Sequence, residues 1–319
     1  MKKFFYLSFL FLLFFSCVSQ RQQKQAVQEN ILTLRDSYCK APHHYNFAQE
    51  VPSYNSDSIL QTRQHLRENF TDQSILILNA LGTLDEVEKI IELKKNPTTD
   101  SKIEMLRLKN IINSKITISL TEIDAVAAEF DCEGERVAQM ANFVDNLNEN
   151  KNNRLVIYSI VAGAAASIAS SIISDDSWSN AVDISGGVLG AGLGFATLNP
   201  KGKKVEFIHA RNLLRDVWQE KLQSKNFPPF VWYMFTEKSF SNSAEGLSII
   251  QNIKKRWLQF NFQNDIEKAN HSVIFNDGGI YRADDLHNRT SMLNQMQSAT
   301  RTINQSINYL LLDLDRFIL

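Results

Sequence analysis

The feature that most limits what this chain can fold into is a pair of uncharged, Gly/Ala/Ser-rich apolar segments at 155–174 and 184–198. The first runs for 20 residues without a charge, about the length that an α-helix needs to cross the apolar core of a bilayer. The second is shorter, and a polar connector joins the two. We therefore expect a tight apolar helical hairpin within 151–204.

Small residues recur at every fourth position in both segments, which clears one face of each helix so that two backbones can pack closely. The connector between them carries Trp178, a residue type that is enriched at membrane interfaces. These features predict a Gly-zipper hairpin that is apolar enough to contact lipid. Its small residues are Gly163, Ser167, Ser171, Gly186, Gly190 and Gly194.

The charges around the hairpin leave two interpretations open. Basic residues on both sides favour an anionic lipid surface. Asp175, Asp176 and Asp183 oppose passage through a bilayer, because a carboxylate inside a membrane is costly. The hairpin can also form the dry centre of a soluble bundle, since small residues let soluble helices pack closely too. The flanking basic residues are Lys151, Arg154, Lys201, Lys203 and Lys204.

The N-terminus is typical of an export signal, with two lysines before an apolar run at 4–15. Residues 13–17 resemble the lipobox of bacterial lipoproteins, although Phe14 replaces the usual Leu. The resemblance implies a signal over 1–17 and attachment of lipid to Cys17, which becomes the first residue of the mature chain. The alternatives are an ordinary signal with an incidental Cys and an N-terminal transmembrane helix.

Residues 18–56 read as a polar tether and an irregular linker. The expected location is the bacterial cell envelope, as an outer-membrane lipoprotein that faces the periplasm or the surface. Beyond Cys17 the chain has only Cys39 and Cys132. In an oxidising compartment these two can form a disulfide, but two cysteines alone do not establish the pairing.

Long helices are expected outside the hairpin, because the chain has only 6 Pro and 12 Gly and half of the Gly lie in 163–194. Within 57–150, capping boxes at Ser58 and Ser101 predict two helix starts. The first helix has an apolar stripe from 66 to 91 and ends at Asn96-Pro97. The second has apolar residues seven apart, the spacing of a coiled coil, at Ile116, Ile123, Phe130, Val137 and Val144.

The C-terminal region, 205–319, is expected to be helical with one small β-hairpin. The strands of that hairpin are predicted at 272–275 and 280–282, and a further short strand at 205–209. The last helix, 284–317, has the most regular heptad pattern and is expected to pair antiparallel with 101–150 or with another subunit. Shorter helices are expected over 210–223, from Pro228-Pro229, and over 244–262. The predicted fold class is mainly α, an elongated helical bundle.

No motif indicates catalysis, a cofactor or a small-molecule substrate. The glycines around Gly190 lack the surroundings of a nucleotide-binding loop. Asp284 and His287 share a helix face, but an Asp there is expected to cap the helix and not to bind a metal. Two charged runs, 131–135 and 254–257, are expected to be solvated helix faces, and a net charge of −1 argues against nucleic-acid binding.

A long heptad helix joined to an apolar hairpin is similar in layout to α-helical pore-forming toxins and colicin-type hairpins, over about 100–200. This likeness carries no residue-level motif and implies no functional residues. The run 130–136 followed by the hairpin resembles uncharacterised lipoproteins of Bacteroidota, which implies an envelope location.

The predicted function is a non-enzymatic, lipid-anchored envelope protein whose hairpin inserts into or against a membrane. It would act as a scaffold or pore-like component and assemble with itself or with envelope proteins through its heptad helices. The alternative is a soluble periplasmic or surface-exposed helical binding module, in which the hairpin is buried core.

Overall fold

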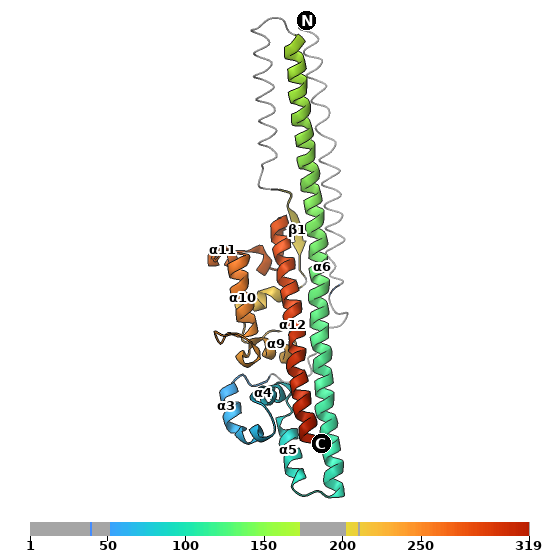
Figure 1. Ribbon diagram of the computed structural model, residues 1–319, viewed down its shortest axis with the longest axis vertical. Helices are drawn as coiled ribbons and strands as arrows, with labels where there is room; N and C mark the ends of the chain where they lie inside the picture. Colours follow the sequence, from blue (N-terminus) through green and yellow to red (C-terminus); the bar gives the residue numbers. More distant parts are fainter. Residues whose placement is uncertain (1–38, 40–51, 173–201, 210, 319) are drawn as a thin grey trace. The chain divides into compact units, whose positions relative to one another are not determined.

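The computed structural model of the protein describes residues 39, 52–172, 202–209 and 211–318. The fold class is confirmed: the protein is mainly helical, with long helices and one small antiparallel sheet (Figure 1). The chain forms two compact units, each assembled from segments that are distant in sequence. Among the described residues, the smaller unit comprises 137–172, 202–207 and 279–287, and the larger one comprises 39, 52–136, 208–278 and 288–318.

The first helical region of the larger unit is not one helix, as predicted, but a series of short ones. Thr71 accepts a hydrogen bond from the Ser74 backbone and starts a new helix. Gly82, with φ +65°, ends it in the left-handed conformation that glycine tolerates best. The predicted capping box at Ser58 is also wrong, because Asn55 caps the helix. The elements are α3 (Ser56–Thr62), η1 (Gln64–Glu68), α4 (Asp72–Leu81) and α5 (Leu84–Lys94).

The second predicted helix is α6 (Thr99–Ile172), which is 74 residues long and continues through the Asn-rich run into the first apolar segment. It does not start at the predicted Ser101–Glu104 box. Instead, the side chains of Thr98 and Ser101 each accept a hydrogen bond from the other's backbone. The five heptad positions, Ile116, Ile123, Phe130, Val137 and Val144, are all buried, as coiled-coil spacing requires.

The last helix, α12 (Ala283–Ile318), runs antiparallel to α6 within the same chain, as predicted (Figure 1). Two contacts give the direction. His287 Nε2 lies 2.7 Å from Asp145 Oδ2. Further along α12, Asn294 lies next to Gly134, which comes earlier on α6, so the two helices run in opposite directions. A Cβ atom at Gly134 would come within 2.9 Å of the Asn294 side chain, so the glycine allows close approach.

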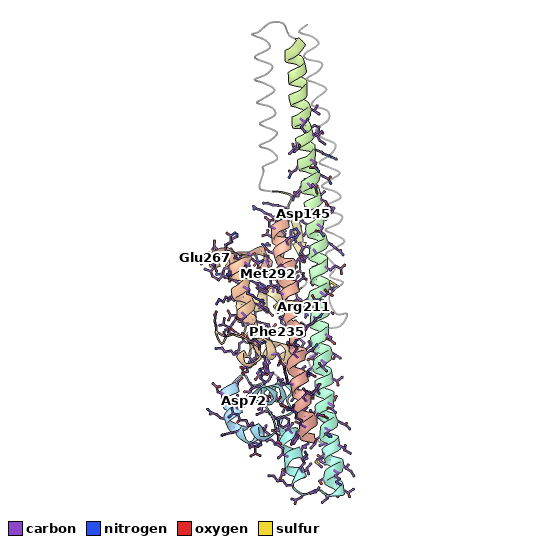
Figure 2. The ribbon with its side chains drawn as sticks, viewed as in Figure 1. Asp72, Asp145, Arg211, Phe235, Glu267 and Met292 are labelled. Carbon is purple, nitrogen blue, oxygen red and sulfur yellow. A yellow bond between two sulfur atoms is a disulfide. The ribbon has the colours of Figure 1, made fainter. Side chains whose placement is uncertain are left out.

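Helix α9 (Pro229–Thr236) lies between α4 and α10 and is buried on every side, including Phe235 (Figure 2). It begins at the predicted proline, and its uniformly apolar sequence is typical of a helix inside a core. The neighbouring helices are shorter than predicted, because turns and caps occupy their ends. The predicted ones are α8 (Leu213–Gln219) and α10 (Ile249–Phe260), whereas η2 (Lys238–Phe240) and α11 (Ile266–Asn270) were not predicted.

The small sheet is present, but its strands differ from the predicted hairpin. Strand β1 (Val205–Ile208) pairs with β2 (Gly278–Tyr281). The segment expected to be the other strand is instead a 3-10 turn, η3 (Val273–Phe275), capped by Ser272. The carbonyl of Ile274 is taken by the side chains of Asn212 and Arg289 and is not available for strand pairing.

Candidate functional site

Apolar side chains are exposed on α6 in the smaller unit, immediately after the Asn-rich run. Five of them, which we call the apolar extension, have exposed fractions between 45% and 64%. At 100° per residue these positions cover an arc of about 200°, wider than the apolar stripe of an amphipathic helix. An exposed apolar surface this wide requires cover from protein or lipid. The apolar extension consists of Val156, Ile157, Tyr158, Ile160 and Val161.

Two positions of the smaller unit that are 55 residues apart in sequence lie together. The backbone N–H of Lys203 donates to the side-chain oxygen of Asn148 at 2.6 Å. Three residues earlier on α6, Asp145 contacts His287 of α12. Phe207 of β1 packs edge-on against Tyr281 of β2. Asn148 and Lys203 are therefore the two ends of one stretch of the chain, which we call the excursion.

Only part of the predicted hairpin lies within the described residues. Gly163, Ser167 and Ser171 belong to α6, where they keep the four-residue spacing. No helix in the described ranges is both long enough and apolar enough to span a membrane. Cys17, Trp178, Gly186, Gly190 and Gly194, with the signal segment and the second apolar segment, lie outside the described residues.

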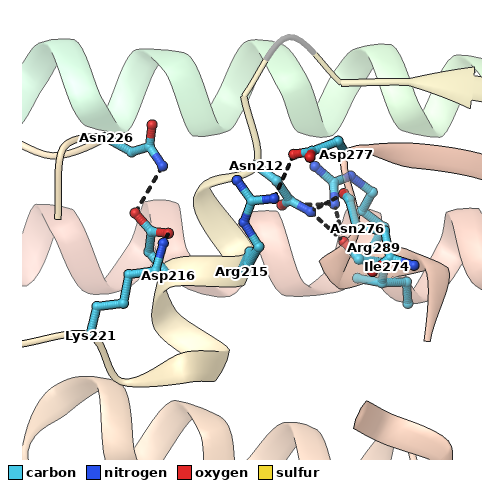
Figure 3. A network of polar contacts seen from close by, with 9 residues as sticks. All are labelled: Asn212, Arg215, Asp216, Lys221, Asn226, Ile274, Asn276, Asp277 and Arg289. Atoms are coloured by element: carbon cyan, nitrogen blue, oxygen red, sulfur yellow. Dashed lines mark hydrogen bonds and ion pairs between the residues drawn. The ribbon is translucent and has the colours of Figure 1, made fainter. Parts of the chain in front are cut away.

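Sequence reasoning missed a buried polar network in the larger unit (Figure 3). The Asn212 amide donates to the carbonyls of Ile274 and Asn276, and its oxygen accepts from Arg289. Arg289 also donates to the Ile274 carbonyl at 2.6 Å. The network joins the start of α8 to the segment before β2. Its signal in the sequence was Arg289, the charged residue that interrupts an otherwise apolar heptad position.

Buried positive charge surrounds one histidine in this part of the larger unit. Burial, followed by the positive charges of Arg289 and Arg136, holds the pKa of His209 far below its usual range, so the imidazole is neutral. Arg136 is completely buried and donates to Glu133 at 2.8 Å. Glu133 is therefore not on a solvated face, as was predicted, although Asp131 is exposed. We assign this cluster a structural role, because buried charges with fixed partners hold packing in register.

A second part of the network holds the loop after α8 against that helix. The buried carboxylate of Asp216 accepts hydrogen bonds from Lys221, Ser224 and Asn226 (Figure 3). Three donors satisfy a carboxylate that would otherwise be costly to bury. The side chain is fully engaged with its own loop, so it offers no open position to a ligand.

The other charged motifs have structural partners. Asp285, and not Asp284, caps α12 by accepting from the backbone of Arg282. His287 pairs with Asp145, and within the described residues no cluster of acidic, His or Cys side chains has the arrangement of a metal site. In the 254–257 run, Lys254 pairs with Glu220 while Trp257 is buried.

Cys39 and Cys132 form a disulfide in the structure, the pairing that the sequence left open. The bond closes a loop with a sequence separation of 93 residues and attaches the segment around Cys39 to the middle of α6. Such a bond is typical of proteins that fold in an oxidising compartment.

A buried carboxylate on α6 predicts a pH effect on stability. Burial raises the pKa of Glu122 to about 7, and among the described residues its Oε2 atom has no hydrogen-bond partner. A pKa raised on folding means that stability is lost as the pH rises from about 4.5 to about 7. We expect the wild type to lose about 1–2 kcal/mol of unfolding free energy over this pH range and Glu122→Gln to lose none. The loss is smaller than the pKa shift alone implies, because the side chain is only half-buried. Urea unfolding of the wild type and Glu122→Gln from pH 4 to pH 8 measures this loss of stability.

Asp124→Asn is the control for this measurement, because it removes an exposed carboxylate from the same helix. If the free energies of unfolding of wild type and Glu122→Gln differ by the same amount at pH 4 and pH 8, burial does not perturb Glu122.

Comparisons of the chain with protein-family models, with curated proteins and with solved structures find no match.

Proposed function

We propose that this protein is a non-enzymatic, lipid-anchored envelope protein that presents the 151–204 excursion to a membrane surface and acts as a scaffold or pore-like component. Lipid on Cys17 would tether the chain in the outer membrane, with the protein facing the periplasm or the surface. Heptad helices would supply contacts to further copies or to envelope proteins. The signal segment at 1–17 and its lipobox-like end support the anchor.

The apolar extension is the observation that carries this proposal. Its five side chains are exposed over an arc of about 200° around α6, wider than the apolar stripe of an ordinary amphipathic helix. The hydrogen bond between Asn148 and Lys203 closes the base of the excursion. Arg154, which precedes the extension, and Lys203 and Lys204 at the return of the chain place positive charge where anionic headgroups would lie.

A soluble binding module is the second candidate. It is favoured by the four-residue spacing of Gly163, Ser167 and Ser171 on α6, because small residues also let soluble helices pack closely. In this case the second apolar segment covers the apolar extension and the hairpin is core.

Flotation on anionic liposomes separates the two functions. The chain from Val18 onward, which lacks the predicted signal and lipid, is mixed with phosphatidylcholine–phosphatidylglycerol vesicles. We expect it to float, and Ile160→Asp to reduce binding by about tenfold. A carboxylate costs about 2.5–3.5 kcal/mol at the centre of a membrane helix and less near the surface, and about 1.4 kcal/mol corresponds to a factor of ten.

Ile103→Asp is the matched control, because Ile103 lies on the same helix and is 61% exposed, against 64% for Ile160. It is expected to float like the wild type. A chain from Val18 that stays in the soluble fraction, or equal losses in the two variants, would contradict the membrane proposal and favour the binding module.

A further inference from the structure

A groove of about 620 Å³ lies in the larger unit, between α10, the segment after η2 and one face of α12. Its volume is within the range of small-molecule sites, about 300–1,000 Å³. A smaller pocket of about 170 Å³ adjoins it and shares Phe240, Ile249 and Gln305 with it. The two together follow α12 from Gln295 to Tyr309, about 21 Å at 1.5 Å per residue.

The face that α12 presents to the groove is polar but uncharged. Gln295, Ser298, Thr302 and Gln305 recur at three- and four-residue spacing, so they form one stripe. Arg301, outside this stripe, is the only charged residue between 290 and 312. The solvated face of a helix normally carries charged side chains, so a stripe of amides and hydroxyls requires another explanation.

Across the groove, α10 and the segment before it add Asn242, Asn252 and Gln259, all with amide side chains. Asn242 and Gln259 offer both hydrogen-bond donors and an acceptor, whereas the Asn252 amide already donates to the Ser241 hydroxyl at 2.8 Å. None of the lining residues is Asp or Glu. The groove is therefore suited to a ligand with many hydroxyl groups and does not repel a negative charge.

Arg256 supplies the one available charge. The other cation of the groove, Lys255, is paired with Glu245. In the part of the chain that the structure describes, no hydrogen bond or ion pair engages the exposed Arg256 guanidinium. A guanidinium binds a carboxylate through two parallel hydrogen bonds. Phe240, half-buried against Tyr233, adds an aromatic surface suited to the apolar face of a sugar ring.

We propose that the α10–α12 groove is a binding site for an acidic oligosaccharide, with Arg256 binding its carboxylate and the amides binding its hydroxyl groups. A peptide fits less well, because peptide grooves provide apolar pockets for side chains. Here four of the lining residues, Phe240, Ile249, Ile253 and Ala299, are apolar, and the other eleven carry amide, hydroxyl or cationic side chains. The inference does not depend on the membrane proposal, since the groove lies in the larger unit.

Calorimetric titration of the full-length chain in detergent tests the site. The acidic probes are trigalacturonate and sialyllactose, and the neutral probes are maltotriose and lactose. We expect at least one acidic probe to bind with a Kd below about 10 mM and the neutral probes to bind at least tenfold more weakly. Arg256→Gln should weaken acidic binding about tenfold, whereas Arg301→Gln, a charge removed from α12 outside the groove, should change it less than twofold.

Three results overturn the proposal: no binding of either acidic probe below about 10 mM, equal binding of acidic and neutral probes, or equal losses in Arg256→Gln and Arg301→Gln. A Glu-rich hexapeptide that binds more tightly than the sugars also overturns it, and makes the groove a peptide site. A Gln305→Ala variant that weakens sugar binding without shifting the thermal unfolding midpoint supports it.

Discussion

Replacing both Cys39 and Cys132 by Ser is expected to lower the free energy of unfolding by about 4–5 kcal/mol. The disulfide closes a loop with a sequence separation of 93 residues. Cross-linking so long a loop removes much of the conformational freedom of the unfolded chain, and chain-entropy estimates for loops of about 100 residues are near 4.7 kcal/mol. An independently folding domain of this size has only about 5–15 kcal/mol in total, so the variant should be close to unfolding at 37 °C.

Urea unfolding of the chain from Val18, followed by circular dichroism, measures this loss. Dithiothreitol provides the control, because it should move the wild-type midpoint to that of the double variant and leave the variant unchanged. Equal midpoints for the oxidised wild type and the double variant would show that Cys39 and Cys132 are not joined in the folded protein.

The long helices were predictable because their signal is periodic and extends over many turns. Ile116 and Phe130 on α6 were placed in the seam from spacing alone, and both are buried. An amphipathic repeat specifies which face is covered before the partner is known. Gly134 had no visible purpose in the sequence, and only the packed helices show that it allows the contact with Asn294.

The short elements were predicted less well, because their ends depend on single side chains with distant partners. The segment 273–275 has strand-like residues, yet Asn212, 62 positions earlier in the chain, takes the Ile274 carbonyl. The α10–α12 groove was invisible for the same reason. Its lining comes from segments about 50 residues apart, and glutamine or serine on one helix resembles an ordinary solvated surface.

Arg136→Gln is expected to lower the free energy of unfolding by about 3–5 kcal/mol, because removing one member of a buried ion pair leaves the other without its counterion. Arg136 is completely buried and donates to Glu133, which is itself only 13% exposed. The substitution also removes a positive charge that lowers the pKa of His209. The larger unit should therefore lose stability, as measured by the urea midpoint of unfolding.

The same helix provides the matched control. Arg107 and Glu104 have the same three-residue spacing on α6 as Arg136 and Glu133, but they lie at the surface. Solvent and salt screen an exposed pair, so Arg107→Gln should leave the urea midpoint where it is in the wild type. A midpoint for Arg136→Gln equal to that of Arg107→Gln would contradict the buried pair. A large loss of stability in Arg136→Gln that is partly reversed in the double variant Arg136→Gln, Glu133→Gln would confirm the buried pair. The double variant removes the carboxylate that had lost its counterion.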